Sequence, residues 1–237
     1  MGRISALGIL GTGTLAALTF VTGLDASANR VAATRAGGTI VGVASTKEAT
    51  QKPIRVTIDP GVCGQTVPDE SIVVDGSGHL ANVVVTVPGV KSQHQAEAPF
   101  TNDKCRFVPR VTFMRPNGTV KMTSKDATLH TMHAAGADGR AFFNVSVPVP
   151  NMTLSRPIDK AGIATLSCST HTWMRAYLHV SEELSASSGV DGKFRLDGVP
   201  AGTYTLKVWH EALKLATPVK VTVKDGETVT VDLMLGK

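Results

Sequence analysis

The sequence predicts an all-β protein made of two β-sandwiches. Its 237 residues include 23 glycines and 12 prolines, and only 18% of the side chains are charged. No long stretch combines Ala, Leu, Glu and Lys at helical spacing, so we expect little helix. Short segments rich in Val, Thr and Ile alternate with turns that contain Gly, Pro or Asp, as strands and hairpins do. The length suits one large or two small domains with buried cores.

The first part of the chain contains two well-marked strands. Residues 38–43 and 80–87 are mostly apolar and contain several valines, and Pro88-Gly89 ends the second of them. Residues 53–59 alternate between apolar and polar side chains, which predicts a half-buried strand. Residues 91–104 are polar and predict a loop.

From residue 106 onward the pattern tightens into closely spaced strands. Between residues 119 and 124, Val120 and Met122 fall on one face, while Lys121 and Thr123 fall on the other. Residues 126–136 are predicted to be a loop that carries two histidines. The strands expected in this region are 108–114, 119–124, 141–147, 151–156, 162–168 and 175–180.

The character of the sequence changes after residue 181. Residues 191–209 place short apolar runs between tight turns, and residues 217–223 and 228–235 flank an Asp225-Gly226 turn. This spacing predicts a small antiparallel sandwich.

The N-terminus is predicted to be an export signal, residues 1–28. Arg3 supplies a positive start, residues 4–24 are uncharged and mostly apolar, and Ala26-Ser27-Ala28 offers a cleavage site between small residues. A retained membrane anchor is the alternative, although many Gly and Thr residues make this segment a poor one. We therefore expect a periplasmic or secreted protein with no stable membrane span after cleavage.

The chain has three cysteines, an odd number for an exported protein. We predict that Cys63 and Cys105 form a disulfide between two loops and that Cys168 binds a metal. The alternative is three free buried thiols, which are uncommon outside the cytoplasm.

The most informative motif is Cys168-x-x-His171-x-x-Met174, between two predicted strands. A short turn between strands can direct a thiolate, an imidazole and a thioether to one point, and His130 can arrive from a neighbouring loop. Two His and one Cys with a weak axial Met are the ligands of a blue-copper electron-transfer site. Zinc is the runner-up metal, because Cys and His also suit it, but zinc rarely takes a thioether. The alternative without a metal is that Cys168 and Met174 are core residues and that His171 has no functional role.

The run from Cys168 to Arg175 resembles the ligand loop of amicyanin-type cupredoxins, and residues 119–133 resemble the strand and loop that deliver the first His of that family. The resemblance covers about residues 106–180. It implies a Greek-key sandwich in which His130, Cys168, His171 and Met174 bind one copper ion.

The same resemblance implies that the imidazole of His171 reaches the surface as the electron port. His133 is expected on the surface or behind a ligand, and Trp173 is expected to shield the metal or simply to cap the core.

Residues 191–235 resemble the carboxypeptidase regulatory-like, or transthyretin-like, sandwich. The upstream strands 38–43 and 80–87 resemble strands of the same family, so we hypothesise that the copper module is inserted into this second sandwich. The expected domains are a cupredoxin-like region at 38–183, with its core at 104–183, and a second sandwich at 184–237 that strands 38–48 and 80–88 could complete.

These features predict an electron carrier with an unidentified redox partner protein. The rivals are a copper storage or delivery protein and a structural surface protein with a non-redox or lost metal site. We expect no enzyme activity, because a closed four-ligand site leaves no position for a substrate. The net charge of +5 is scattered along the chain, so we expect no nucleic-acid binding.

Overall fold

A computed structural model describes residues 37–237 as an almost entirely β-stranded chain. This confirms the predicted all-β class. In residues 37–237 the one helix is the single turn α1 (Pro60–Cys63), so no helix in that range could traverse a bilayer. The predicted signal segment, residues 1–28, lies outside the described residues.

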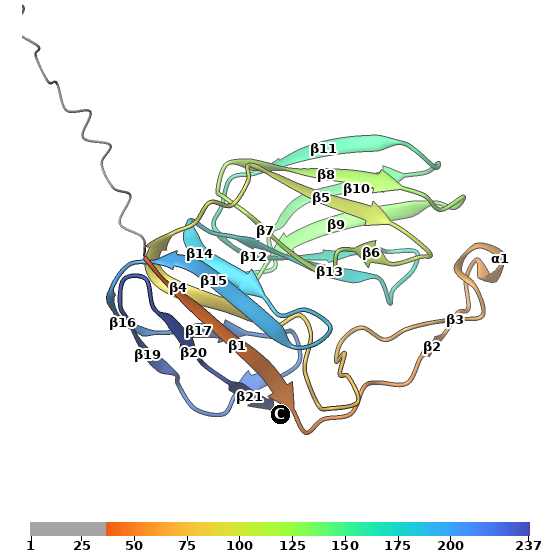
Figure 1. Cartoon of the computed structure of the whole chain (residues 1–237). Helices are drawn as coiled ribbons and strands as arrows, with labels where there is room; N and C mark the ends of the chain where they lie inside the picture. Colours follow the sequence, from red (N-terminus) through yellow and green to blue (C-terminus); the bar gives the residue numbers. More distant parts are fainter. Residues whose placement is uncertain (1–36) are drawn as a thin grey trace, which may run out of the picture. The chain divides into compact units, whose positions relative to one another are not determined.

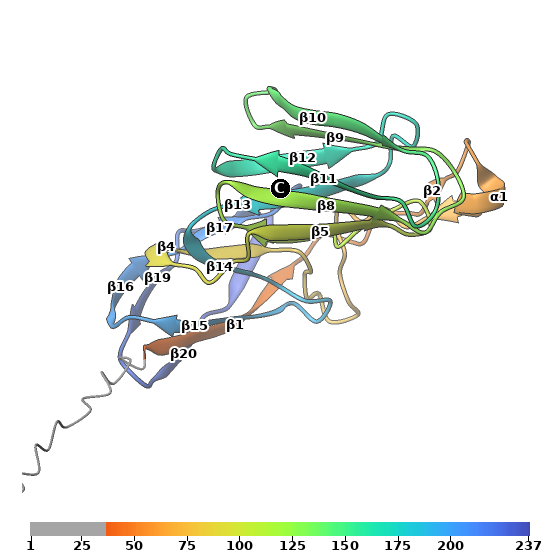
Figure 2. The ribbon, with the colours of Figure 1, turned by 90° about the horizontal axis from the view of Figure 1, so that it is seen from above.

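The first sandwich consists of two sheets that face each other (Figures 1 and 2). One sheet has the order β10-β9-β12-β13-β7, and the other has the order β11-β8-β5-β6. The strands are β5 (Glu97–Asn102), β6 (Phe107–Val108), β7 (Val111–Met114), β8 (Gly118–Ser124), β9 (His130–Gly136), β10 (Ala141–Val147), β11 (Thr153–Ile158), β12 (Gly162–Ser167) and β13 (Arg175–Val180).

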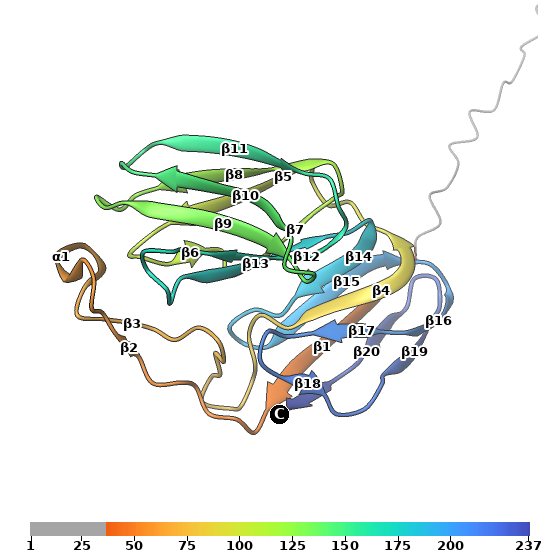
Figure 3. The same cartoon turned by 180° about the vertical axis from the view of Figure 1, so that it is seen from behind.

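The second sandwich combines strands from both ends of the described chain. β1 pairs with β15 on one side and with β20 and β21 on the other, and β4 lies between β14 and β17. Figure 3 shows β16 and β19 paired at one edge. The strands are β1 (Gly38–Thr46), β4 (Val84–Lys91), β14 (Glu183–Ser187), β15 (Lys193–Val199), β16 (Gly202–Thr205), β17 (Lys207–Trp209), β18 (Lys214–Leu215), β19 (Lys220–Val223), β20 (Thr228–Thr230) and β21 (Leu233–Gly236).

The first sandwich leaves and rejoins the second at one place. Lys91 at the end of β4 is opposite Glu183 at the start of β14, and the N–H of Ser92 donates to the carbonyl of Glu182 at 2.7 Å. The segment 92–182 thus begins and ends at adjacent points of the second sandwich.

The chain segment between β1 and β4 extends to the first sandwich. We call residues 54–67 the arm; it contains β2 (Ile54–Arg55), α1 and β3 (Thr66–Val67). Its cysteine joins the first sandwich through the disulfide Cys63–Cys105, which is the disulfide that the sequence predicts.

Each sandwich has a separate hydrophobic core, as alternating strands require. In the first, the fully buried side chains include Phe100, Phe107 and Met122. In the second, they include Ile40, Leu80 and Leu196. The first core also contains Cys168 and Met174, so the predicted ligands lie at the edge of packed apolar side chains.

Three sequence-based expectations for secondary structure are wrong. Residues 91–104 contain β5, in which Ala98 and Phe100 are buried and Pro99 between them is exposed, although proline is depleted in strands. The predicted loop 126–136 contains β9, whose inward positions begin with the polar His130. The predicted strand 53–59 is reduced to two residues of β2, because Pro60 turns the chain into α1.

Candidate metal centre

Two neighbouring strands bring the first two predicted ligands together. β9 begins at His130, and β12 ends one residue before Cys168. The strands are antiparallel neighbours, with Ser167 opposite His133, so His130 and Cys168 reach the same end of the sheet. The backbone N–H of Thr131 donates to the sulfur of Cys168 at 3.4 Å, which fixes the two strand ends together.

The turn from Cys168 to Met174 closes on itself. The N–H of Met174 donates to the carbonyl of His171 at 2.9 Å, and the N–H of Cys168 donates to the carbonyl of Met174 at 3.4 Å. The exposed fractions are 3% for Cys168, 0% for His171 and 1% for Met174. Hydrogen bonding within the turn therefore holds three buried side chains at the end of β12.

Three donor atoms converge at this point. One ring nitrogen each of His130 and His171 and the sulfur of Cys168 all lie within 4.8 Å of one another. The sulfur is 3.8 Å from Nδ1 of His171, and the two imidazole centroids are 4.7 Å apart. Metal bonds to nitrogen and sulfur are about 2.0–2.3 Å long, so separations of this size suit atoms that share one ion.

The sulfur of Cys168 sits in an environment that favours the thiolate. It accepts hydrogen bonds from the backbone N–H groups of Thr131 and His171, both at 3.4 Å. Burial acts against the charged form, but the imidazole of His130 and these donors outweigh it and lower the pKa of Cys168 to about 5. The thiolate is the form that binds a metal.

Both histidines have a carboxylate behind them. Nε2 of His130 is 2.9 Å from Asp126 Oδ2, and Nε2 of His171 is 3.1 Å from Asp59 Oδ2. A carboxylate on one ring nitrogen fixes the tautomer and orients the other nitrogen toward a metal. Nδ1 of His130 is buried and makes no hydrogen bond with the described residues, which is how a nitrogen meant for a metal would stand. The donor set therefore fits copper.

Asp126 is itself tightly held. It accepts hydrogen bonds from the backbone N–H groups of Lys104 at 2.7 Å and Cys105 at 2.9 Å. Burial alone would raise the pKa of Asp126, but the hydrogen bond with His130 and those with the two amides keep it below the ordinary value. Asp126 thus stays charged behind His130.

His171 is not the exposed electron port that the resemblance to cupredoxins implied. Its side chain is completely buried, because the arm places Asp59 over Nε2 and the indole of Trp173 packs edge-on against the ring, with centroids 5.2 Å apart. The indole N–H of Trp173 donates to the carbonyl of Cys105 at 3.0 Å, which holds the indole over the site. Shielding of the site is one of the two roles expected for Trp173.

His133 lies apart from the donor atoms. Along β9, His130, Met132 and Ala134 are buried, whereas His133 is half-buried on the opposite face of the strand. A position away from the donor atoms is one of those that the sequence left open for His133.

Of the two supporting carboxylates, one lies close to its histidine in the sequence and the other lies far from it. Asp126 precedes His130 by four residues, so its contact with that ring is local. Asp59 is 112 residues from His171, and the arm that carries it was predicted to be a strand and an ordinary loop. The only sequence signal for Asp59 was its neighbour Cys63 and the disulfide expected there.

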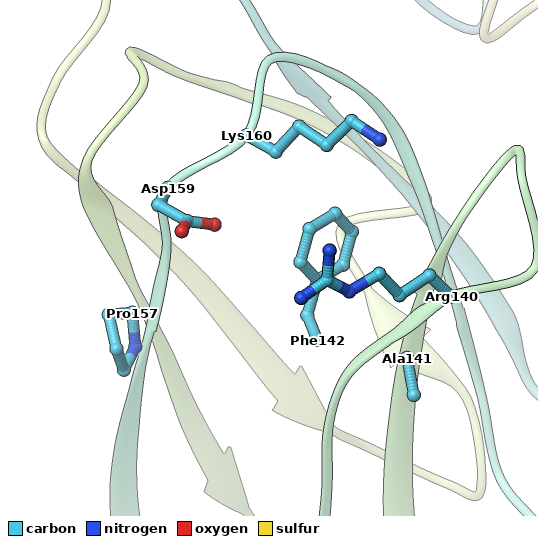
Figure 4. A pocket seen from close by; sticks show the side chains of 6 residues that line it. All are labelled: Arg140, Ala141, Phe142, Pro157, Asp159 and Lys160. Carbon is cyan, nitrogen blue, oxygen red and sulfur yellow. The ribbon is translucent and has the colours of Figure 1, made fainter.

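A hollow lies at the other end of the first sandwich. It has a volume of about 590 Å³, and Figure 4 shows Phe142 inside it with Arg140, Asp159 and Lys160 around it. Lys160 precedes β12 and Cys168 follows that strand, so the hollow is separated from the donor atoms by the length of β12. None of the predicted ligands lines it.

Comparisons with known proteins find one family model and several solved structures that match parts of the chain. Residues 169–236 match the family model of the carboxypeptidase regulatory-like domain. This match begins in the turn after Cys168 and so includes β13, which pairs within the first sandwich. No curated protein matches the chain.

The solved structures that are similar to this chain include cupredoxins. A purple cupredoxin from Nitrosopumilus maritimus is 18% identical, with a TM-score of 0.32, and the match covers 35% of this chain and 99% of that one. Amicyanin from Paracoccus versutus is 15% identical, with a TM-score of 0.33, and the match covers 41% of this chain and 97% of that one. A reduced amicyanin variant is 18% identical, with a TM-score of 0.33 and coverage of 41% and 98%.

Proposed function

We propose that this protein is an exported, mononuclear copper protein of the type 1 kind and that it carries electrons. The observation that supports the proposal is that the thiolate of Cys168, which has a low pKa, converges with ring nitrogens of His130 and His171. All three side chains are buried. Such an N₂S set is the core of a blue-copper site.

Each ligand has a distinct role in the proposed centre. Cys168 supplies the strong, covalent thiolate bond, and His130 and His171 complete a plane with it. Met174, buried in the same core as Cys168, is the weak axial donor. Bound copper would supply a one-electron couple between Cu(I) and Cu(II), while paired strands and two carboxylates keep the donor atoms in nearly constant positions.

A carrier fits this site better than an enzyme. The three converging donors come from residues that are at most 3% exposed, so a substrate has no open approach to them. The partner is therefore proposed to be a second redox protein that exchanges electrons across the protein surface. The Cys63–Cys105 disulfide supports export, because disulfides persist in oxidising compartments.

The absorption spectrum of oxidised, copper-loaded protein tests this function. We expect an intense visible band from thiolate-to-Cu(II) charge transfer, and we expect Cys168→Ser to abolish it, because the serine oxygen cannot replace the thiolate. His133→Gln is the matched control, since His133 lies on the same strand but faces away, and its band should be unchanged.

Two outcomes would contradict the proposal. A protein that takes up copper only as a colourless Cu(I) form would favour storage or delivery. A protein that is colourless with copper and is isolated with stoichiometric zinc would favour the other metal.

A further inference from the structure

The arm covers His171, one of the proposed copper ligands. Asp59 Oδ2 is 3.1 Å from Nε2 of His171, and the same oxygen accepts a hydrogen bond from the hydroxyl of Thr128 at 2.5 Å. Thr128 lies two residues before His130. Asp59 therefore links the arm to both histidine-bearing segments of the proposed centre.

The local structure of the arm holds Asp59 in place. Its carbonyl accepts hydrogen bonds from the N–H groups of Val62 at 3.0 Å and Cys63 at 2.9 Å, which close the single turn α1. Asp59 has φ of 53°, in the left-handed region that Asp and Asn tolerate better than most residues.

The disulfide ties the arm to the carboxylate behind the other histidine. Cys63 closes α1, and its partner Cys105 donates its N–H to Asp126, which in turn holds His130. The backbone of α1, the disulfide and the N–H of Cys105 thus connect Asp59 to Asp126. The arm is therefore covalently attached next to the site.

We propose that Asp59 is a positioning residue that closes the copper centre. This inference rests on the function proposed above. Asp59 keeps the proton of His171 on Nε2, so that Nδ1 is free for the metal. Its negative charge favours Cu(II) over Cu(I), and its side chain covers the ring edge through which His171 would otherwise exchange electrons and ligands with solvent. The outward path for electrons then lies elsewhere on the protein.

Two substitutions separate the charge from the cover. Asp59→Asn keeps the side-chain shape, an acceptor for His171 and a residue suited to the left-handed backbone, but removes the charge. Asp59→Gly keeps the backbone conformation and removes both charge and cover. Asp138→Asn is the matched charge control, because Asp138 pairs with Lys160 beyond the other end of β9.

The experiment measures the reduction potential and copper affinity of the full chain and the imidazole ¹⁵N spectrum of the metal-free protein at one pH. We expect a higher potential in Asp59→Asn and Asp59→Gly but not in Asp138→Asn. Copper affinity should fall by about 10- to 100-fold in Asp59→Gly, the range typical for loss of a carboxylate behind a metal-binding histidine. The metal-free wild type should show His171 with its proton on Nε2, and Asp59→Gly should show a mixture of tautomers.

The outcomes distinguish this inference from the proposed function. If the wild type has the charge-transfer band but Asp59→Asn has an unchanged potential and Asp59→Gly an unchanged tautomer, Asp59 merely anchors the arm and the inference is wrong. If the wild type has no band, the electron-carrier function fails, and the ¹⁵N spectrum still decides whether Asp59 positions His171.

Discussion

At the residue scale, the proposed centre is a charge pair before any metal binds. The pKa of Cys168 is lowered to about 5, while the pKa of His130 is raised to about 9, because the hydrogen bond to Asp126 and the negative charge of the neighbouring thiolate outweigh the effect of its burial. His130 Nδ1 and the charged sulfur of Cys168 would be the atoms that hold a metal at this point. Metal binding at the proposed centre would therefore release one proton, from His130 rather than from the thiol.

The charge pair predicts how the stability of the metal-free protein depends on pH. Between pH about 5 and 6.5, the unfolded chain holds a proton on Cys168 that the folded chain lacks, so the free energy of unfolding rises with pH. From pH 6.5 to about 9, the folded chain holds a proton on His130 that the unfolded chain lacks, and the two effects cancel. We expect a rise and then a plateau in denaturant unfolding measured in the presence of a chelator.

Two buried histidines add to the acid limb of this profile. Burial lowers the pKa of both His179 and His210 to about 4, so each stays neutral in the folded chain and gains a proton on unfolding as the pH falls from 6.5 to about 4. Cys168→Ser should therefore reduce the slope between pH 5 and 6.5 without removing it. An unchanged slope in that variant would show that Cys168 is not a thiolate in the metal-free protein.

Local sequence motifs were sufficient to bring most residues of the candidate site to attention. Cys168, His171 and Met174 are close in sequence, and one turn brings them together, so their spacing carried the information. Asp59 escaped prediction because only the tertiary path of the arm places it beside His171. The burial of His171 was missed for the same reason, since it depends on a segment that the resemblance to cupredoxins does not cover.

At the element scale, the arm depends on its disulfide. α1 is one turn long, and β2 and β3 pair over two residues each, so hydrogen bonding within the arm is slight. The strands of the sandwiches were predictable because alternation and turns mark them locally. β5 and the arm were not, because Pro99 obscures the first and the cross-link of Cys63 to Cys105 defines the second.

Removing the disulfide should loosen the arm and destabilise the protein. The bridge spans a sequence separation of 42, for which the chain-entropy model gives about 3–4 kcal/mol. We expect the double variant Cys63→Ala/Cys105→Ala to lose free energy of unfolding on this order and His171 to become reactive toward an imidazole-modifying reagent.

Reduced wild-type protein is the control for this variant and should behave in the same way. An arm that keeps His171 protected after loss of the bridge would show that the contact with Asp59 alone is enough to hold it.

At the scale of the whole molecule, the two sandwiches are joined by more than the chain crossing at residues 91 and 183. Arg110 of the first sandwich donates two hydrogen bonds to Glu211 of the second, at 2.8 and 2.7 Å, and the hydroxyl of Tyr177 donates to the same carboxylate at 3.0 Å. The ring of Trp209 packs edge-on against Tyr177 with centroids 5.0 Å apart. Tyr177 lies on β13, the strand that follows Met174, so the second sandwich supports the strand that leaves the proposed centre.

β1 and β4 each pair with strands of the C-terminal part of the chain, which predicts that this part cannot fold alone. A fragment of residues 183–237 lacks β1, which separates β15 from β20 and β21, and lacks β4, the partner of both β14 and β17. Its buried side chains, among them Phe194 and Leu196, would lose their neighbours Ile40 and Val85. We expect this fragment to show no cooperative unfolding and to be digested rapidly by proteases.

The matched control is a chain of residues 37–237 in which a short Gly-Ser linker replaces residues 92–182. Because the N–H of Ser92 already contacts the carbonyl of Glu182 at 2.7 Å, such a linker spans the gap without strain, and this control should fold cooperatively. A protease-resistant fragment of residues 183–237 would show instead that β1 and β4 are dispensable to the second sandwich.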